Sequence, residues 1–366
     1  MRVVVAMDSF GDLQADGVVE VFNWGWADIS PDDALRSAPM SDGGPGFVAV
    51  LASIVLDSPD VYVDATGPTG EPGGGYVVVD GPTAYVESAY GCGLDLLERH
   101  HGDVRTATTY GVGQYVAAAA AHEGVRTVVI GLGGSGTNDG GAGLWAALGA
   151  EPAEVLRGGG AALKDLDSVS VPELGVRLVA ATDVDNPLLG LHGASAVYGP
   201  QKGADRAAVM ELDAALERWA DVVEAAVGKP GLRDAPGAGA AGGLGFGLLA
   251  LGATRRSGIE IVMDVVDLRG KVEAADLVVT GEGKFDRTSL RGKVVSGVAR
   301  VAQEAGVPCV VAAGQAEVGA REAAANGIDD VFSIAALLGS AEAALAAGQD
   351  GIRELGRAVA KSWSRR

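Results

Sequence analysis

The sequence predicts an α/β protein in which helices cover parallel strands, organised as more than one domain. Its 366 residues exceed the length at which a single hydrophobic core usually stops growing, so two domains are expected. Aromatic residues make up only 5% of the chain, which suits buried parallel strands better than an aromatic-rich sandwich. A buried strand, a polar glycine loop and a helix also follow one another repeatedly, as they do in doubly wound sheets.

The two ends of the chain carry this pattern most clearly. The run Val3–Met7 predicts a buried strand that ends in polar residues, and Asp12 would cap the apolar helix Leu13–Trp26. A short strand near Ala34–Ala38 leads to a glycine-rich loop and a helix over Phe47–Leu56. The last part of the chain alternates strands and helices. The expected strands are Asp276–Thr280, Pro308–Ala312 and Asp330–Ile334, and the expected helices are Leu290–Ala305, Ala320–Asn326 and one that begins at Ala341.

The middle of the chain has a different pattern. Residues 61–64 and 76–87 alternate apolar and polar side chains around a glycine-rich turn, which predicts a β-hairpin. A long helix is expected over 204–227, with Trp219 in the core or an interface. No proline- or serine-rich linker separates two halves, so we infer one domain from both chain ends and a second domain inserted between them.

Charge and composition exclude several classes of function. A formal net charge of −20 argues against nucleic-acid and anionic-membrane surfaces, because both require clustered lysine and arginine. The N-terminal apolar run is too short for a signal peptide, and no apolar stretch approaches the roughly 18 residues of a membrane helix. Cys92 and Cys309 give no disulfide framework, so we expect a cytoplasmic protein.

Five polar loops share one design, because each follows an apolar strand and offers Asp, Asn, Ser or Glu, and three of them contain glycine. They are Asp8-Ser9, Asp42-Gly43-Gly44, Gly133–Gly143, Asp183–Asn186 and Gly281-Glu282-Gly283. Glycine lets backbone N–H groups approach phosphate oxygens, and carboxylates at the same edge suit Mg²⁺. Any one of these loops alone is more often a structural turn, but five together indicate phosphate chemistry.

The loop at residues 131–136 fits the dinucleotide pattern G-x-G-x-x-G, with Glu151 and Glu154 near the expected ribose-binding distance. We nevertheless reject NAD binding, because residues 137–141 separate the third glycine from the helix and Asp139 adds negative charge there. The chain contains no G-x-x-x-x-G-K-[ST] sequence either. A nucleotide would therefore occupy a site that is not a P-loop.

Three lysines stand beside glycine in predicted loops or helix starts, namely Lys202, Lys284 and Lys293. A lone surface lysine carries no information about function. Beside acidic, glycine-rich loops, however, these cations are candidates to offset the charge that develops in phosphoryl transfer.

Ordered motifs along the chain resemble those of the bacterial type I glycerate kinases. They include MDSF, SDGG, TGPTGEP, GGSGTNDGGAG, ATDVDNPLLG, GASAVYGPQKGA, PGAGAAGGLG and VVTGEGKFDRTSLRGK. The resemblance implies a flavodoxin-like domain from residues 1–64 and 258–366, with a different α/β domain inserted at 65–257. It also implies phosphorylation of a glycerate hydroxyl that depends on ATP and Mg²⁺, usually yielding 2-phosphoglycerate. The implied partner is a small hydroxy acid, and the oligomeric state, with a homodimer among the options, stays open.

Three charges of the family motifs are missing from this chain. The family's DSFKGSLSA is DSFGDLQA here, which removes a lysine, and Pro45 and Phe47 replace a glutamate and a threonine. Val112 and Gln114 replace a threonine and a second glutamate. Three interpretations remain: an unchanged glycerate kinase, a kinase with an altered acceptor such as a related hydroxy acid, and a non-catalytic protein that binds a nucleotide or metabolite.

The resemblance and the loop chemistry together assign roles to individual residues. For the nucleotide phosphates we expect a polar glycine cradle formed by Gly133, Gly134, Ser135, Thr137 and Asn138, with Glu282 also on the nucleotide side. For Mg²⁺ or the hydroxyl proton we expect Asp183 and Asp185, and for the developing charge Lys202 or Lys293. The acceptor would be bound by Asp8, Ser9, Asp42, Gly43 and Gly44. Positioning and electrostatics suffice for this chemistry.

Overall fold

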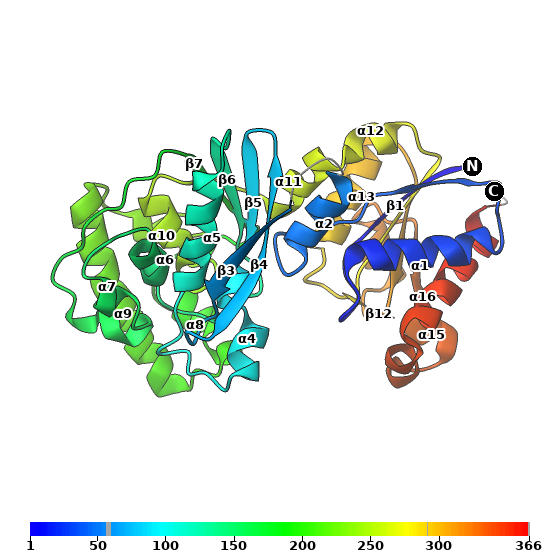
Figure 1. Ribbon diagram of the computed structural model, residues 1–366. Helices are drawn as coiled ribbons and strands as arrows, with labels where there is room; N and C mark the ends of the chain where they lie inside the picture. The colour runs from blue at the N-terminus through cyan, green and yellow to red at the C-terminus, as the bar shows by residue number, and fades with distance from the viewer. Residues whose placement is uncertain (56–59, 291, 365–366) are drawn as a thin grey trace. The chain divides into compact units, whose positions relative to one another are not determined.

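The structure is a computed structural model that describes residues 1–55, 60–290 and 292–364. Contacts divide the chain into two compact α/β units (Figure 1). The terminal unit comprises Met1–Asp42, Ala49–Ile54 and Ile259–Arg366, and the middle unit comprises Gly43–Val48 and Val55–Gly258. The predicted α/β class with parallel sheets is confirmed.

Among the described residues, five parallel strands form the sheet of the terminal unit. They are β1 (Arg2–Met7), β2 (Ala34–Ser37), β9 (Leu277–Gly281), β11 (Cys309–Ala313) and β13 (Asp330–Ser333). Their spatial order is β13-β11-β9-β1-β2, so along the chain this unit reads 2-1-3-4-5, the flavodoxin-like order. The direction of winding reverses between β1 and β9. Ligands of open α/β sheets bind outside the carboxyl ends of the strands at such a reversal.

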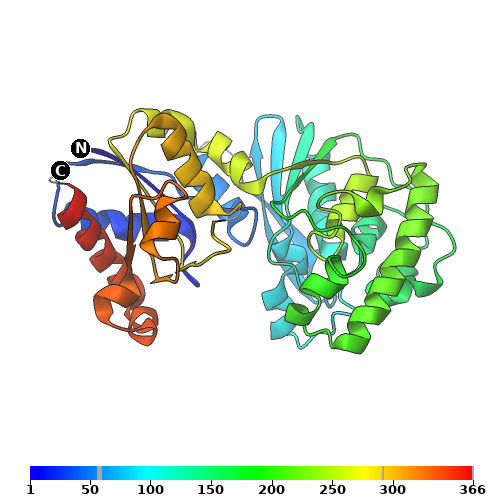
Figure 2. The ribbon, with the colours of Figure 1, turned by 180° about the vertical axis from the view of Figure 1, so that it is seen from behind.

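Helices cover both faces of this sheet. Helices α1 (Ala15–Ala27) and α16 (Ala341–Trp363) pack together over one face in Figure 1, and α13 (Val294–Ala305) covers the other face in Figure 2. Glycine permits the close approach of α1 to α16, because a Cβ on Gly25 would overlap the carbonyl oxygen of Arg353. The remaining elements are α2 (Phe47–Ile54), α11 (Gly258–Val265), α12 (Leu268–Glu273), α14 (Ala320–Ala324), α15 (Ile334–Leu338), β10 (Lys284–Phe285) and β12 (Gln315–Ala316).

The connection from β1 to α1 differs from the prediction. The helix begins at Ala15 after Gln14, and Asp12 does not cap it. Instead, the backbones of Phe10 and Leu13 exchange two hydrogen bonds of 3.0 and 3.2 Å, which close a tight turn before the helix. The Asp12 side chain is exposed.

The middle unit contains a mixed sheet. Among the described residues its strands are β3 (Asp60–Thr66), β4 (Pro72–Asp80), β5 (Thr83–Glu87), β6 (Thr127–Gly131), β7 (Arg177–Ala181) and β8 (Thr254–Arg256), paired in that order. The pairs β3–β4 and β4–β5 are antiparallel, and the later pairs are parallel. The expected hairpin is therefore present, but a turn at Gly81 and Pro82 divides its second arm into β4 and β5.

Helices surround this sheet and enclose a core that contains two tryptophans in contact with each other. The rings of Trp145 and Trp219 meet edge to face at 5.4 Å, and both are fully buried, which confirms a core position for Trp219. The helices are α3 (Ala89–Cys92), α4 (Leu94–Arg99), α5 (Tyr110–Ala121), α6 (Ala142–Ala147), α7 (Ala153–Leu156), α8 (Ala194–Tyr198), α9 (Arg206–Val227) and α10 (Leu244–Ala250). Short 3₁₀ helices span Gly160–Asp165, Pro200–Lys202 and Leu232–Asp234.

Some element ends differ from expectation. Helix α2 ends at Ile54, and the predicted end at Leu56 lies outside the described residues. Strand β3 belongs to the sheet of the middle unit because it pairs along its length with β4. Across the described ranges, no helix combines the length and the apolar character needed to cross a membrane.

Candidate functional site

The loop that joins β6 to α6, residues 132–141, contains most of the residues predicted to hold phosphate. The start of this loop packs against the glycine loop that contains Gly43 and Gly44. The N–H group of Gly133 donates a hydrogen bond to the carbonyl oxygen of Gly43 at 3.0 Å. A Cβ on Gly133 would lie 2.3 Å from the Cα of Gly44, so no side chain fits at this contact. The structure therefore brings the predicted phosphate loop and the Gly43-Gly44 part of the predicted acceptor loop together within the middle unit.

Lys202 holds the next part of the same loop. Its ammonium donates to Ser135 Oγ at 2.9 Å and to the carbonyl oxygen of Thr137 at 2.7 Å. The side chain is only 5% exposed, and this burial lowers the pKa of Lys202 to about 8. The residue is still mostly protonated at neutral pH. It thus places a positive charge against the loop expected to receive an anionic ligand.

Asn138 adds a buried amide to this cluster. Its Nδ2 donates to Ser195 Oγ at 2.9 Å, and both residues are fully buried. Its Oδ1 is also buried and has no hydrogen-bond partner among the described residues. Unpaired buried carbonyl groups are rare, which makes this oxygen a candidate ligand-binding atom.

Asp139 has a structural role that the sequence did not reveal. Its carboxylate accepts hydrogen bonds from the backbone and hydroxyl of Thr109 at 2.7 and 2.8 Å, and from Gly141 and Gly143 N–H at 3.1 Å each. Complete burial raises the pKa of Asp139, while these bonds oppose the increase. The negative charge is directed into the starts of α5 and α6, where helix dipoles favour it. Asp139 therefore holds the loop, since both of its carboxylate oxygens already accept hydrogen bonds from the protein.

Glu87 is a second residue that sequence reasoning missed. Its Oε2 accepts from Gly46 N–H at 3.1 Å and from Val48 N–H at 3.2 Å, at the start of α2. Burial raises the pKa of Glu87 to about 7. The feature of the sequence that could have identified this role is a glutamate at the end of a buried strand. Glu87 anchors the segment that carries Gly43 and Gly44.

Side chains of the cluster Asp183–Asn186, which follows β7, are engaged by other residues of the protein. Asp185 is 75% exposed and forms an ion pair with Arg255 at 2.5 Å. Asn186 is used structurally, because its Nδ2 donates to the carbonyl oxygen of His192 and its Oδ1 accepts from Tyr198 OH. Asp183 is half-buried beside them. Of the two predicted metal ligands, Asp185 would have to leave its arginine partner to bind a cation.

The other predicted residues lie in the terminal unit. Asp8 and Ser9 follow β1, Asp42 comes after β2, Glu282 follows β9, and Lys293 directly precedes α13. Asp8 accepts from Ser9 N–H at 2.7 Å, and burial, followed by the charges of Asp42 and Glu282, raises the pKa of Asp8 to about 7. Burial also raises the pKa of Glu282, against opposing effects of Ser289 and Lys293. Its Oε1 is buried without a partner in the described structure. The terminal unit thus gathers three mutually repelling carboxylates.

The predicted residues therefore form two groups. The middle unit holds Gly43, Gly44, Gly133, Gly134, Ser135, Thr137, Asn138, Asp183, Asp185 and Lys202, and the terminal unit holds Asp8, Ser9, Asp42, Glu282 and Lys293. Within the described residues, no group of three or more His, Cys, Asp or Glu side chains is arranged to hold a metal ion. Both cysteines are buried thiols.

Comparisons with known proteins agree along the whole chain. A family model described as the glycerate kinase family matches residues 3–364. The chain is 37% identical to glycerate 2-kinase of Escherichia coli K12, over 98% of this chain and 97% of that protein. It is 40% identical to glycerate kinase of Bacillus subtilis 168, over 91% and 90% of the two chains. A crystal structure from Salmonella typhimurium LT2 that carries the glycerate kinase 2 name superposes with a TM-score of 0.81 at 35% identity, covering 100% of this chain and 98% of that one.

Replacing Glu87 tests its anchoring role. Glu87→Ala leaves the N–H groups of Gly46 and Val48 without their acceptor, and we expect the free energy of unfolding to fall by about 1–3 kcal/mol. Glu87→Gln retains one acceptor oxygen, so its free energy of unfolding should fall clearly less. Urea denaturation at pH 7 measures both, and equal stability of the alanine variant and the native chain would contradict the assignment.

Asp8 predicts a specific pH dependence of stability. Its folded pKa of about 7 exceeds the ordinary value of 3.8, so between these pH values the folded chain binds more protons than the unfolded chain. The contribution of Asp8 to stability is therefore present at low pH and is lost as pH rises through 7. We expect Asp8→Asn to stabilise the protein by up to about 4 kcal/mol at pH 8 and little at pH 4. Urea denaturation midpoints across this range check it, and a variant with no pH-dependent gain would show that Asp8 titrates normally.

Proposed function

This chain belongs to the glycerate kinase family, and on that premise we propose that it transfers the γ-phosphoryl group of ATP to a hydroxyl of glycerate. It is a phosphotransferase that acts on an alcohol hydroxyl. The observation that carries the proposal is the loop 132–141, whose glycines suit phosphate together with the buried Lys202 that donates hydrogen bonds to it. The product we propose is 2-phosphoglycerate, in line with the name of the Escherichia coli relative.

The donor phosphates would lie against the loop 132–141. Gly133 and Gly134 lack side chains where the loop would approach phosphate oxygens. Ser135, Thr137 and Asn138 supply polar groups, and the ammonium of Lys202 offsets negative charge. Because Lys202 already holds two loop oxygens, it needs no rearrangement to keep its charge in place.

Mg²⁺ fits this chain as an ion shared with phosphate oxygens. The described residues hold no cluster of three acidic or histidine ligands, so an all-protein cage does not fit. Mg²⁺ bound to nucleotides commonly uses one or two carboxylates together with water and phosphate oxygens. We propose Asp183 and Asp185 for this role. When bound, the ion would neutralise phosphate charge.

The acceptor would be bound by Asp8, Ser9 and Asp42, with Gly43 and Gly44. Asp8 is the best supported proton acceptor among them, because a pKa of about 7 lets a carboxylate both lose and accept a proton near neutral pH. Ser9 N–H, which donates to Asp8 Oδ1, orients the carboxylate. Lys293, whose charge opposes the raised pKa of Glu282, is the second candidate cation.

Two of the family positions that are replaced in this chain favour an unchanged acceptor. Phe47 is fully buried and packs edge to face against Tyr85, with ring centroids 6.3 Å apart, so it fills core space. Gln114 accepts hydrogen bonds from the backbone and hydroxyl of Thr66 at 2.8 and 3.1 Å. Both replacements therefore act as structural contacts. We accordingly propose glycerate as the acceptor in preference to a more apolar hydroxy acid.

A coupled assay of ADP release tests the function directly. With Mg-ATP present, we expect turnover with glycerate to exceed turnover with lactate, glycolate and tartrate by at least about tenfold, since binding of the full set of polar groups determines specificity. Phosphorus NMR of the product should show 2-phosphoglycerate. ATP binding without turnover of any acceptor would contradict the kinase assignment, and preference for another acceptor would contradict glycerate.

A further inference from the structure

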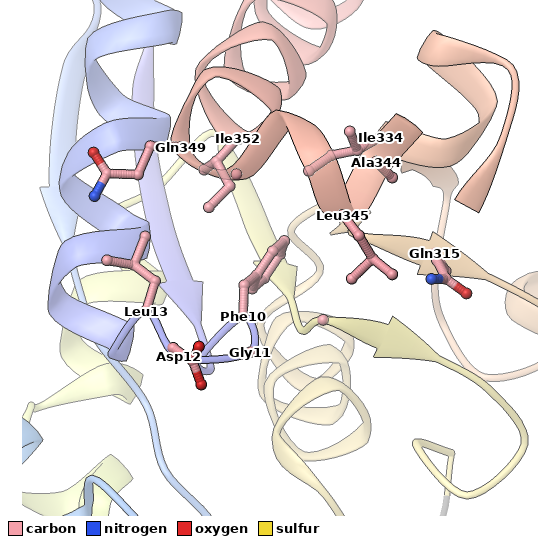
Figure 3. Close-up of a pocket in the computed structure, with 13 residues that line it drawn as sticks. Phe10, Gly11, Asp12, Leu13, Gln315, Ile334, Ala344, Leu345, Gln349 and Ile352 are labelled. Atoms are coloured by element: carbon pink, nitrogen blue, oxygen red, sulfur yellow. The ribbon is translucent and has the colours of Figure 1, made fainter. Parts of the chain in front are cut away.

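The terminal unit contains a cavity of about 360 Å³ that the roles assigned above do not use (Figure 3). Phe10 and Gly283, which follow β1 and β9, both line it. The cavity therefore lies at the carboxyl ends of these strands, where the winding of the sheet reverses and ligands of such folds bind. Its volume falls within the range of about 300–1,000 Å³ that is typical of small-molecule sites.

The walls of the cavity are apolar. Figure 3 shows the Phe10 ring rising from its loop towards α16, where Leu345 and Ile352 face it. Leu13 and Ile334 complete the apolar lining. Leu345 is 76% exposed, an unusually large exposure for a leucine at the mouth of a cavity. These walls present flat and branched apolar surfaces to an occupant.

Two backbone features give the cavity its shape. Helix α16 is interrupted at Gly348, where φ is 49° and ψ is −127°, a conformation that favours glycine. On the opposite side, a Cβ on Gly314 would lie 2.5 Å from the carbonyl oxygen of Gly283, so the floor carries no side chain there. The cavity is thus bounded by a bend in a helix and by bare backbone.

Two glutamine side chains line the cavity beside its apolar residues. Gln315 from β12 and Gln349 from α16 lie on two sides of the cavity in Figure 3. Each amide can donate and accept hydrogen bonds. Among the described residues that line the cavity none is lysine or arginine, and Asp12 adds a negative charge. An anionic hydroxy acid would find no counter-charge here.

We propose that this cavity binds the purine base of a nucleotide. A purine has two apolar faces for the Phe10, Leu345 and Ile352 surfaces, and an edge of donors and acceptors for the amides of Gln315 and Gln349. The base is uncharged, which suits a cavity without basic residues. The binding of a purine rests on the lining of the cavity and not on the proposed function.

The test measures binding of ADP and of adenosine to the full chain by isothermal titration calorimetry. Adenosine has no phosphates, so it reports on the base alone. Leu345→Asp places a carboxylate at the mouth, and we expect it to weaken both ligands at least tenfold. The matched control is Leu338→Asp, because Leu338 is an exposed leucine on neighbouring α15 that does not line the cavity. It should leave both affinities unchanged.

A second variant examines the polar edge. Gln349→Leu should reduce the preference for ADP over GDP at least threefold while the chain still binds both nucleotides. Affinities for ADP and adenosine that stay within twofold in Leu345→Asp would overturn the proposal, as would failure of the native chain to bind adenosine. Glycerate turnover of the native chain is measured separately. Purine binding without turnover would refute the proposed function alone, and turnover with unaltered nucleotide affinity in Leu345→Asp would refute the base site alone.

Discussion

The buried ammonium of Lys202 is the interaction on which the candidate phosphate site depends. A charge removed from water must be satisfied by nearby oxygens, and the loop 132–141 supplies them through Ser135 Oγ and the Thr137 carbonyl. The same loop is fixed by Asp139 to the starts of α5 and α6, and by Trp219, which donates to the Gly140 carbonyl at 2.9 Å. The loop is therefore arranged before a ligand arrives, which lowers the entropic cost of binding.

The residues proposed for the reaction differ in charge between the two units. The middle unit presents glycine backbone and a protonated lysine, which suit an anionic phosphate in a chain whose net charge is −20. The terminal unit gathers Asp8, Asp42 and Glu282, whose burial and mutual repulsion raise the pKa of Asp8 towards neutrality. A carboxylate tuned in this way suits removal of a hydroxyl proton. Phosphoryl transfer requires little from a protein beyond such positioning and electrostatic stabilisation.

Periodicity and glycine loops in the sequence predicted the α/β class, the hairpin and the buried position of Trp219, because these follow from local patterns of burial. They could not predict the functions of Asp139 and Glu87, since each carboxylate is satisfied by backbone N–H groups from distant segments. The ion pair of Asp185 with Arg255 likewise joins residues far apart in the sequence. Asp12 is not a cap because residues 10–13 form a backbone turn and the helix begins only at Ala15, after Gln14. The partners in such long-range hydrogen bonds, unlike periodicity, cannot be read from the local sequence.

The affinity of the full chain for Mg-ATP in Lys202→Met tests the central claim most directly. Methionine fills a similar volume without charge, so the fold should persist, and Lys164→Met removes an exposed lysine as the matched control. The account predicts that Lys202→Met weakens Mg-ATP binding at least tenfold at pH 7. It also predicts that native affinity declines as pH rises through about 8, where Lys202 loses its proton. Unchanged affinity in Lys202→Met, with no such decline in the native chain, would contradict the claim that this loop and its lysine hold the phosphates.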